Sequence, residues 1–325
     1  MTFARVLASL VCALALNAGE VSAQGYPARP ITLVIAFPPG GATDAVARPV
    51  TDAMSQTLGQ QIVIEYVGGA GGTLGAARVA RAAPDGYTIL IHQPGLPIGA
   101  AMYPRLSFDV EKDFTGIGAV ANMATVMVGR STLPADTLPE LVRWMKGPGQ
   151  RAKVAHAGVG SFGHVCGVMF AQEVGALTDQ IPYRGGGPAL NDVVAGHADL
   201  SCLSAAVAAE LVKAGKLKGY GIFRNKRFAG LSDVPNFVEA GYKTLDLPFW
   251  QVLFAPAGTP RPVIERLNAA LLEAIANPKV RDVFEKNAMD PYAEAQQTPE
   301  AATTMLHDEI KRWGAVVRAN NITAQ

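Results

Sequence analysis

The sequence has few charged residues and no long hydrophobic run. Charged residues make up 17% of its 325 residues, below the usual quarter, and the 28 basic and 27 acidic residues leave a net charge of +1. No block of lysine or arginine occurs, so we expect no nucleic-acid partner, and any selectivity for anions must be local. No stretch of about 20 uninterrupted apolar residues occurs either, which predicts no insertion into a membrane.

The first 23 residues have the pattern of a secretory signal peptide. Arg5 gives a positive start, residues 6–16 are an apolar run of signal length, and residues 21–23 end in the small-x-small pattern that a signal peptidase reads. The run is too short to anchor the chain in a bilayer. We therefore expect a soluble, exported protein that begins at Gln24 once the signal peptide, residues 1–23, has been removed.

Cysteine and histidine are too few to suggest a metal centre. Cys12 lies inside the signal peptide, without the small residues that should precede a lipidated cysteine. Export would bring Cys166 and Cys202 into an oxidising compartment, where a pair of thiols in one domain tends to be joined. The alternative is two buried, unpaired cysteines. No second histidine or cysteine stands at ligand spacing from His164, so we expect neither a metal ion nor a cofactor.

The chain is organised around a strand, a turn and a helix near its start. Residues 31–37 form an apolar run that suits a buried strand, and apolar residues at four-residue spacing over 46–58 predict a helix packed by one face. Residues 38–41, Pro-Pro-Gly-Gly, end the strand and turn the backbone, and Thr43 can cap the helix. The free N–H groups of such a turn favour a carboxylate or a phosphate, although a simple connection is the alternative.

A second site of the same kind occurs about half a chain later. Residues 153–157 predict a strand, residues 158–164 read Gly-Val-Gly-Ser-Phe-Gly-His, and a helical segment follows. Two such turns suggest two lobes that close on one ligand.

Strands alternate with helices through both halves, which predicts an α/β fold with a mainly parallel sheet in each lobe. Ligands of such sheets bind beyond the carboxyl ends of the strands, so Phe37 and Gln93 are expected to line the pocket. We interpret strands at 124–129 and 249–255 as the crossings between lobes. The first lobe then comprises residues 24–124 and 250–325, and the second comprises residues 125–249. The other predicted strands are 31–37, 61–67, 87–93, 153–157, 180–183, 198–203 and 217–223, and further helices are expected at 73–83, 137–145, 262–276, 278–286 and 299–318.

Six short motifs, each weak alone, occur in a specific order along the mature chain. They are Pro39-Gly-Gly-x-x-Asp44 with Arg48, Asp85-Gly-Tyr87, Leu106-x-x-Asp109 with Lys112-Asp-Phe114, Gly158-x-Gly-Ser161-x-x-His164, Pro182-Tyr-x-Gly185 with Gly187-Pro-Ala189, and Phe254-Ala-Pro-Ala-Gly-Thr-Pro260. In this order they resemble the Bug-type solute receptors of the tripartite tricarboxylate transporter family. The resemblance implies a two-lobed periplasmic-binding-protein fold of type II, which captures a small carboxylate and delivers it to the permease subunits of a membrane transporter.

The resemblance also implies where the ligand binds. In the family, the first turn and the helix start after the second turn hold one carboxylate, partly through ordered water. Together with the strand ends and two departures from the family pattern, the predicted ligand-binding residues are Phe37, Gly41, Ala42, Thr43, Asp44, Gln93, Gly160, Ser161, Phe162, Gly163, His164 and Arg184. We expect a periplasmic monomer whose ligand is a dicarboxylate, a tricarboxylate, an aromatic acid or an acidic amino acid.

Three residues depart from the family pattern. His156 stands where a small residue is common, Phe162 brings an aromatic ring, and Arg184 replaces a lysine. Phe162 could stack on an aromatic acid or pack against the hinge, and Arg184 could pair with a second carboxylate or stay solvated. His164 is expected to support the helix start. Asp44 is interpreted as a helix-start residue or a water holder, because a bare carboxylate would repel the ligand.

Two other classes of function compete with a receptor that serves a transporter. Gly158-x-Gly-x-x-Gly163 matches a dinucleotide fingerprint, with Arg184 roughly 20 residues further on. Tyr183 stands in the place of the ribose-binding acid, however, and Ser161 has Val159 two residues before it where a hydrolase elbow has glycine, so we expect no enzyme. The other class is a periplasmic sensor that docks to a signalling partner, which the sequence does not distinguish from a transport receptor.

Overall fold

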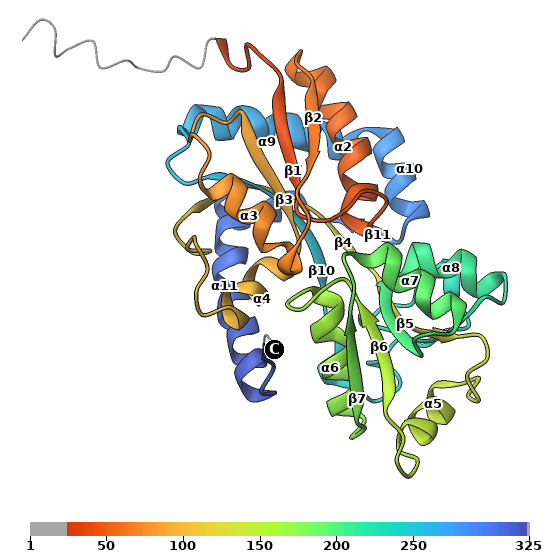
Figure 1. Cartoon of the computed structure of the whole chain (residues 1–325). Coiled ribbons are helices and arrows are strands. Elements are labelled where there is room, and N and C mark those ends of the chain that lie inside the picture. Colours follow the sequence, from red (N-terminus) through yellow and green to blue (C-terminus); the bar gives the residue numbers. More distant parts are fainter. Residues whose placement is uncertain (1–24, 324–325) are drawn as a thin grey trace, which may run out of the picture.

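Two sheets flanked by helices form two lobes, one above the other in Figure 1. The computed structural model describes residues 25–323, so the predicted signal peptide lies outside the described residues. The predicted two-lobed α/β fold is confirmed. Within the described range, no helix is both long and apolar enough to cross a membrane.

The first lobe contains a six-stranded sheet in the order β11-β4-β10-β3-β1-β2. Strands β1, β2 and β3 are parallel, whereas β10 runs antiparallel to β3 and β4, and β11 runs antiparallel to β4. The strands are β1 Ile31–Ile35, β2 Ile62–Tyr66, β3 Thr88–His92, β4 Phe114–Met123, β10 Phe249–Pro256 and β11 Met289–Pro291. The helices are α2 Ala42–Leu58, α3 Thr73–Ala80, α4 Gly95–Met102, α9 Arg261–Ala276, α10 Pro278–Lys286 and α11 Pro299–Ala319.

The second lobe contains a five-stranded sheet in the order β7-β6-β8-β5-β9. Its strands β7, β6 and β8 are parallel, and β5 is antiparallel to both β8 and β9. The strands are β5 Thr125–Arg130, β6 Ala152–His156, β7 Thr178–Pro182, β8 Leu200–Ser204 and β9 Leu217–Ile222, and the helices are α5 Leu138–Met145, α6 Phe162–Glu173, α7 Gly186–Ala195 and α8 Ala205–Lys213.

Both sheets are therefore mixed, which corrects the expectation of mainly parallel sheets. The physical reason lies in the connections between the lobes. The chain leaves the first sheet through β4 and returns through β10, and two strands that run out and back beside each other must be antiparallel. The parallel part of each sheet is the part that is built from strand-helix-strand units.

The chain crosses between the lobes at two adjacent places. Strand β4 ends at Met123 and β5 begins at Thr125, so only Ala124 separates the two sheets. The predicted strand at 124–129 thus lies in the second sheet, and the crossing precedes it. On the return, the Phe249 N–H donates to Asn122 Oδ1 at 3.0 Å where β10 enters the first sheet. Two short adjacent crossings are the arrangement that a hinge requires.

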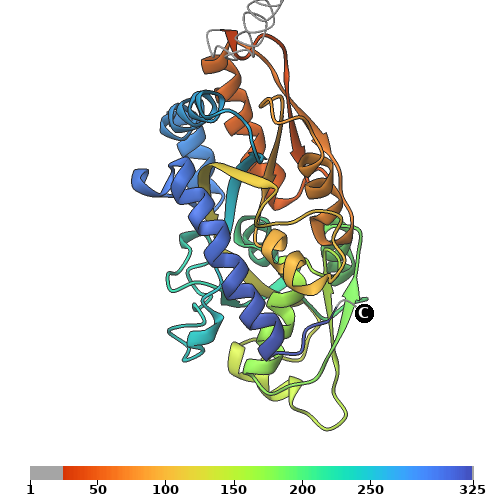
Figure 2. The same ribbon diagram turned by 90° about the vertical axis from the view of Figure 1, so that its left-hand side faces the viewer.

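Helix α11 extends from the first lobe to the second (Figures 1 and 2). Within the first lobe, the buried Glu309 carboxylate accepts hydrogen bonds from the indole N–H groups of Trp250 and Trp313, each at 2.8 Å. At the other end, Gln172 Nε2 on α6 donates to the Asn320 carbonyl at 2.9 Å. The helix therefore supports the hinge from one side.

Strand β1 shows how the core positions the first turn. Leu33 and Ile35 pack with α2 in one apolar cluster, and Val34 and Ala36 belong to another cluster on the opposite face. Because both faces are buried, the carboxyl end of β1 is fixed in place. Helix α2 continues through Pro49, for which the structure shows no function.

Candidate ligand-binding site

A cavity of about 180 Å³ lies between the lobes. Its wall includes residues from the first turn of four helices: α2 from the first lobe, and α6, α7 and α8 from the second. The lining residues are Phe37, Pro38, Pro39, Gly40, Gly41, Ala42, Thr43, Gln93, Thr125, His156, Ala157, Ser161, Phe162, Gly163, Gly186, Gly187, Pro188, Ala189, Leu190, Ser201, Cys202, Leu203, Ser204, Val207 and Phe249. Four positive helix ends around one small cavity favour an anion.

The first turn is held from behind by a buried carboxylate. Asp44 accepts hydrogen bonds from the Gly40 N–H at 2.8 Å, from the Tyr66 hydroxyl at 2.6 Å and from Arg48 Nε at 3.0 Å. Burial by itself raises the pKa of Asp44, but the bonds from Tyr66, Gly40 and Arg48 outweigh it and hold the pKa below its usual value. Asp44 is thus ionised at neutral pH.

The N-terminus of α2 has no capping side chain. Its N-cap residue is Gly41, in extended conformation, and no side chain in the described part of the protein caps the helix. Those N–H groups also lack a partner within the helix. Ala42 and Thr43 line the cavity at this point, so their N–H groups are suited to bind an anion there.

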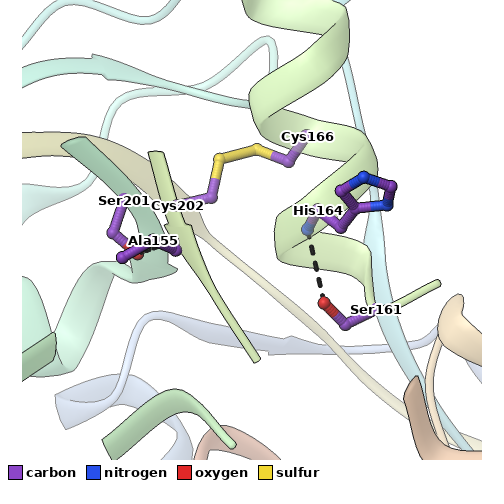
Figure 3. The surroundings of a disulfide bond; sticks show 6 residues. All are labelled: Ala155, Ser161, His164, Cys166, Ser201 and Cys202. Atoms are coloured by element: carbon purple, nitrogen blue, oxygen red, sulfur yellow. Dashed lines mark hydrogen bonds between the residues drawn. A yellow bond between two sulfur atoms is a disulfide. The ribbon is translucent and has the colours of Figure 1, made fainter. Parts of the chain in front are cut away.

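The second turn presents the start of α6 in a similar way. Gly158 and Gly160 have φ values of +119° and +79°, which lets the backbone reverse sharply before the helix. Ser161 is the N-cap, and its hydroxyl accepts from the His164 N–H at 3.3 Å (Figure 3). The N–H groups of Phe162 and Gly163 come before the first helical hydrogen bond, and both residues line the cavity.

A disulfide joins the start of α6 to the sheet below it. Cys166 on α6 is bonded to Cys202 on β8, with the Cα atoms 6.4 Å apart (Figure 3). Strands β6 and β8 are parallel neighbours, so the helix start and the strand end meet at one sheet edge. The structure thus favours the disulfide over two unpaired cysteines. The bond fixes the second turn against the lobe that carries it.

The cavity contains no charged side chain at neutral pH. Among the described residues that line it, none is Asp, Glu, Lys or Arg. His156 is titratable, but its burial and the neighbouring His164, whose ring centroid lies 4.6 Å away, lower its pKa to about 4. Burial also lowers the pKa of His164 to about 4. An anion in the cavity would therefore bind to N–H groups and hydroxyls rather than to a cation.

Eight of the twelve predicted site residues line this cavity. They are Phe37, Gly41, Ala42, Thr43, Gln93, Ser161, Phe162 and Gly163. Asp44 instead supports the first turn from behind, and Gly160 lies under the ring of Tyr103. His164 Nδ1 accepts from the Gly160 N–H at 3.4 Å, and Arg184 is exposed just before α7.

Phe162 packs toward the hinge while it lines the cavity. Its ring lies 4.6 Å from the Phe249 ring and 6.3 Å from the Trp313 ring, measured between centroids. These contacts favour the packing role over free stacking on a ligand.

Sequence reasoning missed lining residues from the crossings and from the second lobe. Thr125 and Phe249 lie beside the hinge, and Ser201 and Ser204 come from β8. The rule that ligands bind beyond the carboxyl ends of strands could have found the β8 residues, had it been applied to the second lobe.

The two lobes, their hinge and the cavity between them define the class of periplasmic binding proteins. A model of the family described as "Tripartite tricarboxylate transporter family receptor" matches residues 46–322, and the chain belongs to this family. The resemblance drawn from the six motifs is thereby confirmed. Proteins of this family are solute-binding receptors, and this chain is a receptor rather than an enzyme.

Individual relatives match over nearly the whole chain. Protein BugT of Bordetella pertussis is 34% identical over 325 residues, which cover 98% of each chain. The structure of the periplasmic binding protein BugD has a TM-score of 0.87 and 32% identity, and covers 92% of this chain and 100% of its own. MatC from Rhodopseudomonas palustris, solved with bound malate, has a TM-score of 0.85 and 35% identity over 90% of this chain and 100% of its own.

Proposed function

We propose that this protein captures a small carboxylate in the periplasm and delivers it to the permease subunits of a tripartite transporter. The observation that carries the proposal is the convergence of four helix N-termini on one cavity whose lining, among residues 25–323, includes no charged side chain. The malate bound to the related MatC supports a carboxylate as the ligand. The predicted signal peptide, residues 1–23, would direct export of this chain and then be removed.

The carboxylate would bind between the two turns. Free N–H groups at the start of α2 and α6 face the cavity from opposite lobes, and each helix end favours a negative charge by about 0.3–1 kcal/mol, or more when partly buried. The hydroxyls of Thr43 and Ser161 lie in the same wall. Asp44 is negative but is already neutralised by Arg48, so its repulsion of the ligand is reduced.

Such a ligand would couple binding to lobe closure. A carboxylate can accept hydrogen bonds from both lobes only when the lobes are together. It therefore binds the closed state more tightly than the open state and shifts the equilibrium toward closure. We propose as the moving units residues 24–124 with 250–325, and residues 125–249, which rotate about the two crossings.

Ala42→Pro tests the role of main-chain donors. Ala42 is the first helical residue of α2, a position where proline fits because its N–H is not used by the helix. Gly41 before it is extended, as the residue before a proline prefers to be. The variant should therefore fold normally, yet lose one donor to the ligand and bind at least about tenfold more weakly, since a hydrogen bond to a charged group contributes about 1.5–3 kcal/mol.

The matched control is Ala42→Ser, which keeps the N–H and adds one atom at the same site. Isothermal titration with malate, adipate, benzoate and glutamate measures the affinities of wild type and both variants. Equal affinities in the proline and serine variants would exclude the Ala42 N–H as a ligand donor.

Delivery to a permease needs a separate experiment. Cells that lack the protein should lose uptake of the carboxylate that it binds, and the purified protein should restore uptake in spheroplasts that retain the permease. Restoration of a kinase-dependent signal without uptake would favour the sensor.

A further inference from the structure

The lobes also touch at a place that does not line the cavity. Tyr103, at the end of α4 in the first lobe, donates its hydroxyl to the Val159 carbonyl of the second turn at 3.0 Å. The same ring covers Gly160, because a Cβ atom added to that glycine would lie only 3.0 Å from Tyr103 Cε2. The Tyr103 side chain of the first lobe thus contacts the second turn in two ways: its hydroxyl binds the Val159 carbonyl, and its ring packs on Gly160.

A glycine of the first lobe meets the same turn backbone to backbone. A Cβ atom added to Gly71 would lie 2.5 Å from the Val159 oxygen, 2.9 Å from the Gly160 carbonyl carbon and 3.1 Å from the Ser161 nitrogen. All three are main-chain atoms, which cannot move aside as the end of a flexible side chain can. Any residue larger than glycine at position 71 would therefore keep the lobes apart.

We propose that Gly71 and Tyr103 form a closure clamp on the turn at residues 158–161. The clamp acts as a positioning device: neither residue lines the cavity, but the turn that they hold leads into α6, whose first N–H groups face the ligand. The inference rests on the proposed function, because it concerns the closed state that a bound carboxylate stabilises.

The clamp affects binding through the population of the closed state. When only the closed state binds fully, the apparent dissociation constant rises in proportion as the closed fraction falls. Because the contacts join atoms of different lobes, they exist only when the lobes are together. A change in either residue should therefore weaken binding through the loss of these inter-lobe contacts, in addition to any effect on the lobe that carries the residue.

A matched pair of glycine variants tests the clamp. Gly71 and Gly59 both lie in the first lobe with positive φ values of +66° and +69°, so alanine is strained to a similar degree at both positions. An added Cβ atom has nothing within 4 Å at Gly59 but strikes the second lobe at Gly71. Gly71→Ala should bind carboxylate probes at least about tenfold more weakly than Gly59→Ala, at a similar melting temperature of the ligand-free proteins.

Tyr103→Phe gives a second, milder test. It removes the hydroxyl that reaches Val159 and keeps the ring, so binding should weaken by about 2- to 10-fold, the range of a single hydrogen bond. The loss should appear as faster dissociation, because the clamp forms after encounter.

The probes are malate, adipate, benzoate and glutamate, and solution scattering at saturating probe supplies a readout of closure. Wild type and Gly59→Ala should become more compact with a bound probe, whereas Gly71→Ala should not. If wild type binds no probe, the proposed function fails together with the clamp. If wild type binds and Gly71→Ala matches Gly59→Ala in affinity and compaction, only the clamp is wrong.

Discussion

Removal of the disulfide between Cys166 and Cys202 should destabilise the protein by an amount that the loop length sets. The bond closes a loop with a sequence separation of 36 residues. In the chain-entropy description, cross-linking a loop of this length lowers the conformational entropy of the unfolded chain. This loss raises the free energy of unfolding by about 4 kcal/mol. Cys166 is fully buried in a packed lobe, so replacement by alanine also leaves a small cavity, which adds to the loss.

The assay is urea unfolding at pH 7 of the mature protein and of the double variant Cys166→Ala/Cys202→Ala. We expect the free energy of unfolding of the double variant to be lower by about 3–5 kcal/mol. Reductant should shift the wild-type midpoint toward that of the variant and leave the variant itself unchanged. After the signal peptide is cut, these two are the only cysteines, so thiol titration of the denatured protein should find none free. Two free thiols, or equal midpoints with and without reductant, would refute the reasoning.

Two further predictions concern stability. Burial lowers the pKa values of His156 and His164 from 6.5 to about 4. Between about pH 4 and pH 6.5 the unfolded chain therefore binds more protons than the folded protein. The free energy of unfolding should therefore fall as the pH drops from about 6.5 to about 4, by up to about 3 kcal/mol for each histidine, and a flat urea-midpoint profile in that window would contradict this. Asp44→Asn should lower stability by about 2 kcal/mol, because it weakens the bonds from Gly40 and Tyr66, and an unchanged urea midpoint would argue against that network.

Elements with local signals could be predicted from the sequence. Helix α5, predicted at 137–145, begins with a capping box between Thr137 and Glu140, and α10 spans the predicted residues 278–286. The strand, turn and helix around the first turn are likewise in place, with β1 at Ile31–Ile35 and α2 from Ala42. In each case a cap, a proline or a periodic apolar face lies within a few residues of the element that it marks.

Strand β4 could not be predicted, because its environment is not local. Phe114–Met123 is buried along almost its whole length, so it lacks the alternation that marks a half-exposed strand. It also contains Gly116 and Gly118, which weaken the sequence pattern of a strand. In the structure, both glycines allow neighbouring segments to pack closely against the strand. A Cβ atom at Gly116 would lie 2.7 Å from Ala302 on α11, nearly two hundred residues further along the chain.

The residues of the candidate site likewise fall into two groups: those marked by a local signal and those that depend on contacts between distant parts of the chain. The turns at 38–43 and 158–163 carry their own glycines, so their roles could be read from the sequence, whereas the cap expected at Thr43 does not form because Gly41 is the N-cap. Thr125 and Phe249 reach the cavity only because the two crossings lie side by side, which depends on the pairing of β4 with β10. The neutral state of His156 likewise depends on burial beside His164.

The most direct test of the central claim is a titration of the mature protein with carboxylates and their primary amides. An amide keeps the size and shape of the acid but removes the negative charge that four helix N-termini are proposed to bind. We predict that at least one of malate, adipate, benzoate and glutamate binds with measurable heat, and that its amide binds at least about a hundredfold more weakly, which corresponds to about 2.7 kcal/mol. Equal affinity for acid and amide, or no binding of any acid, would contradict the account.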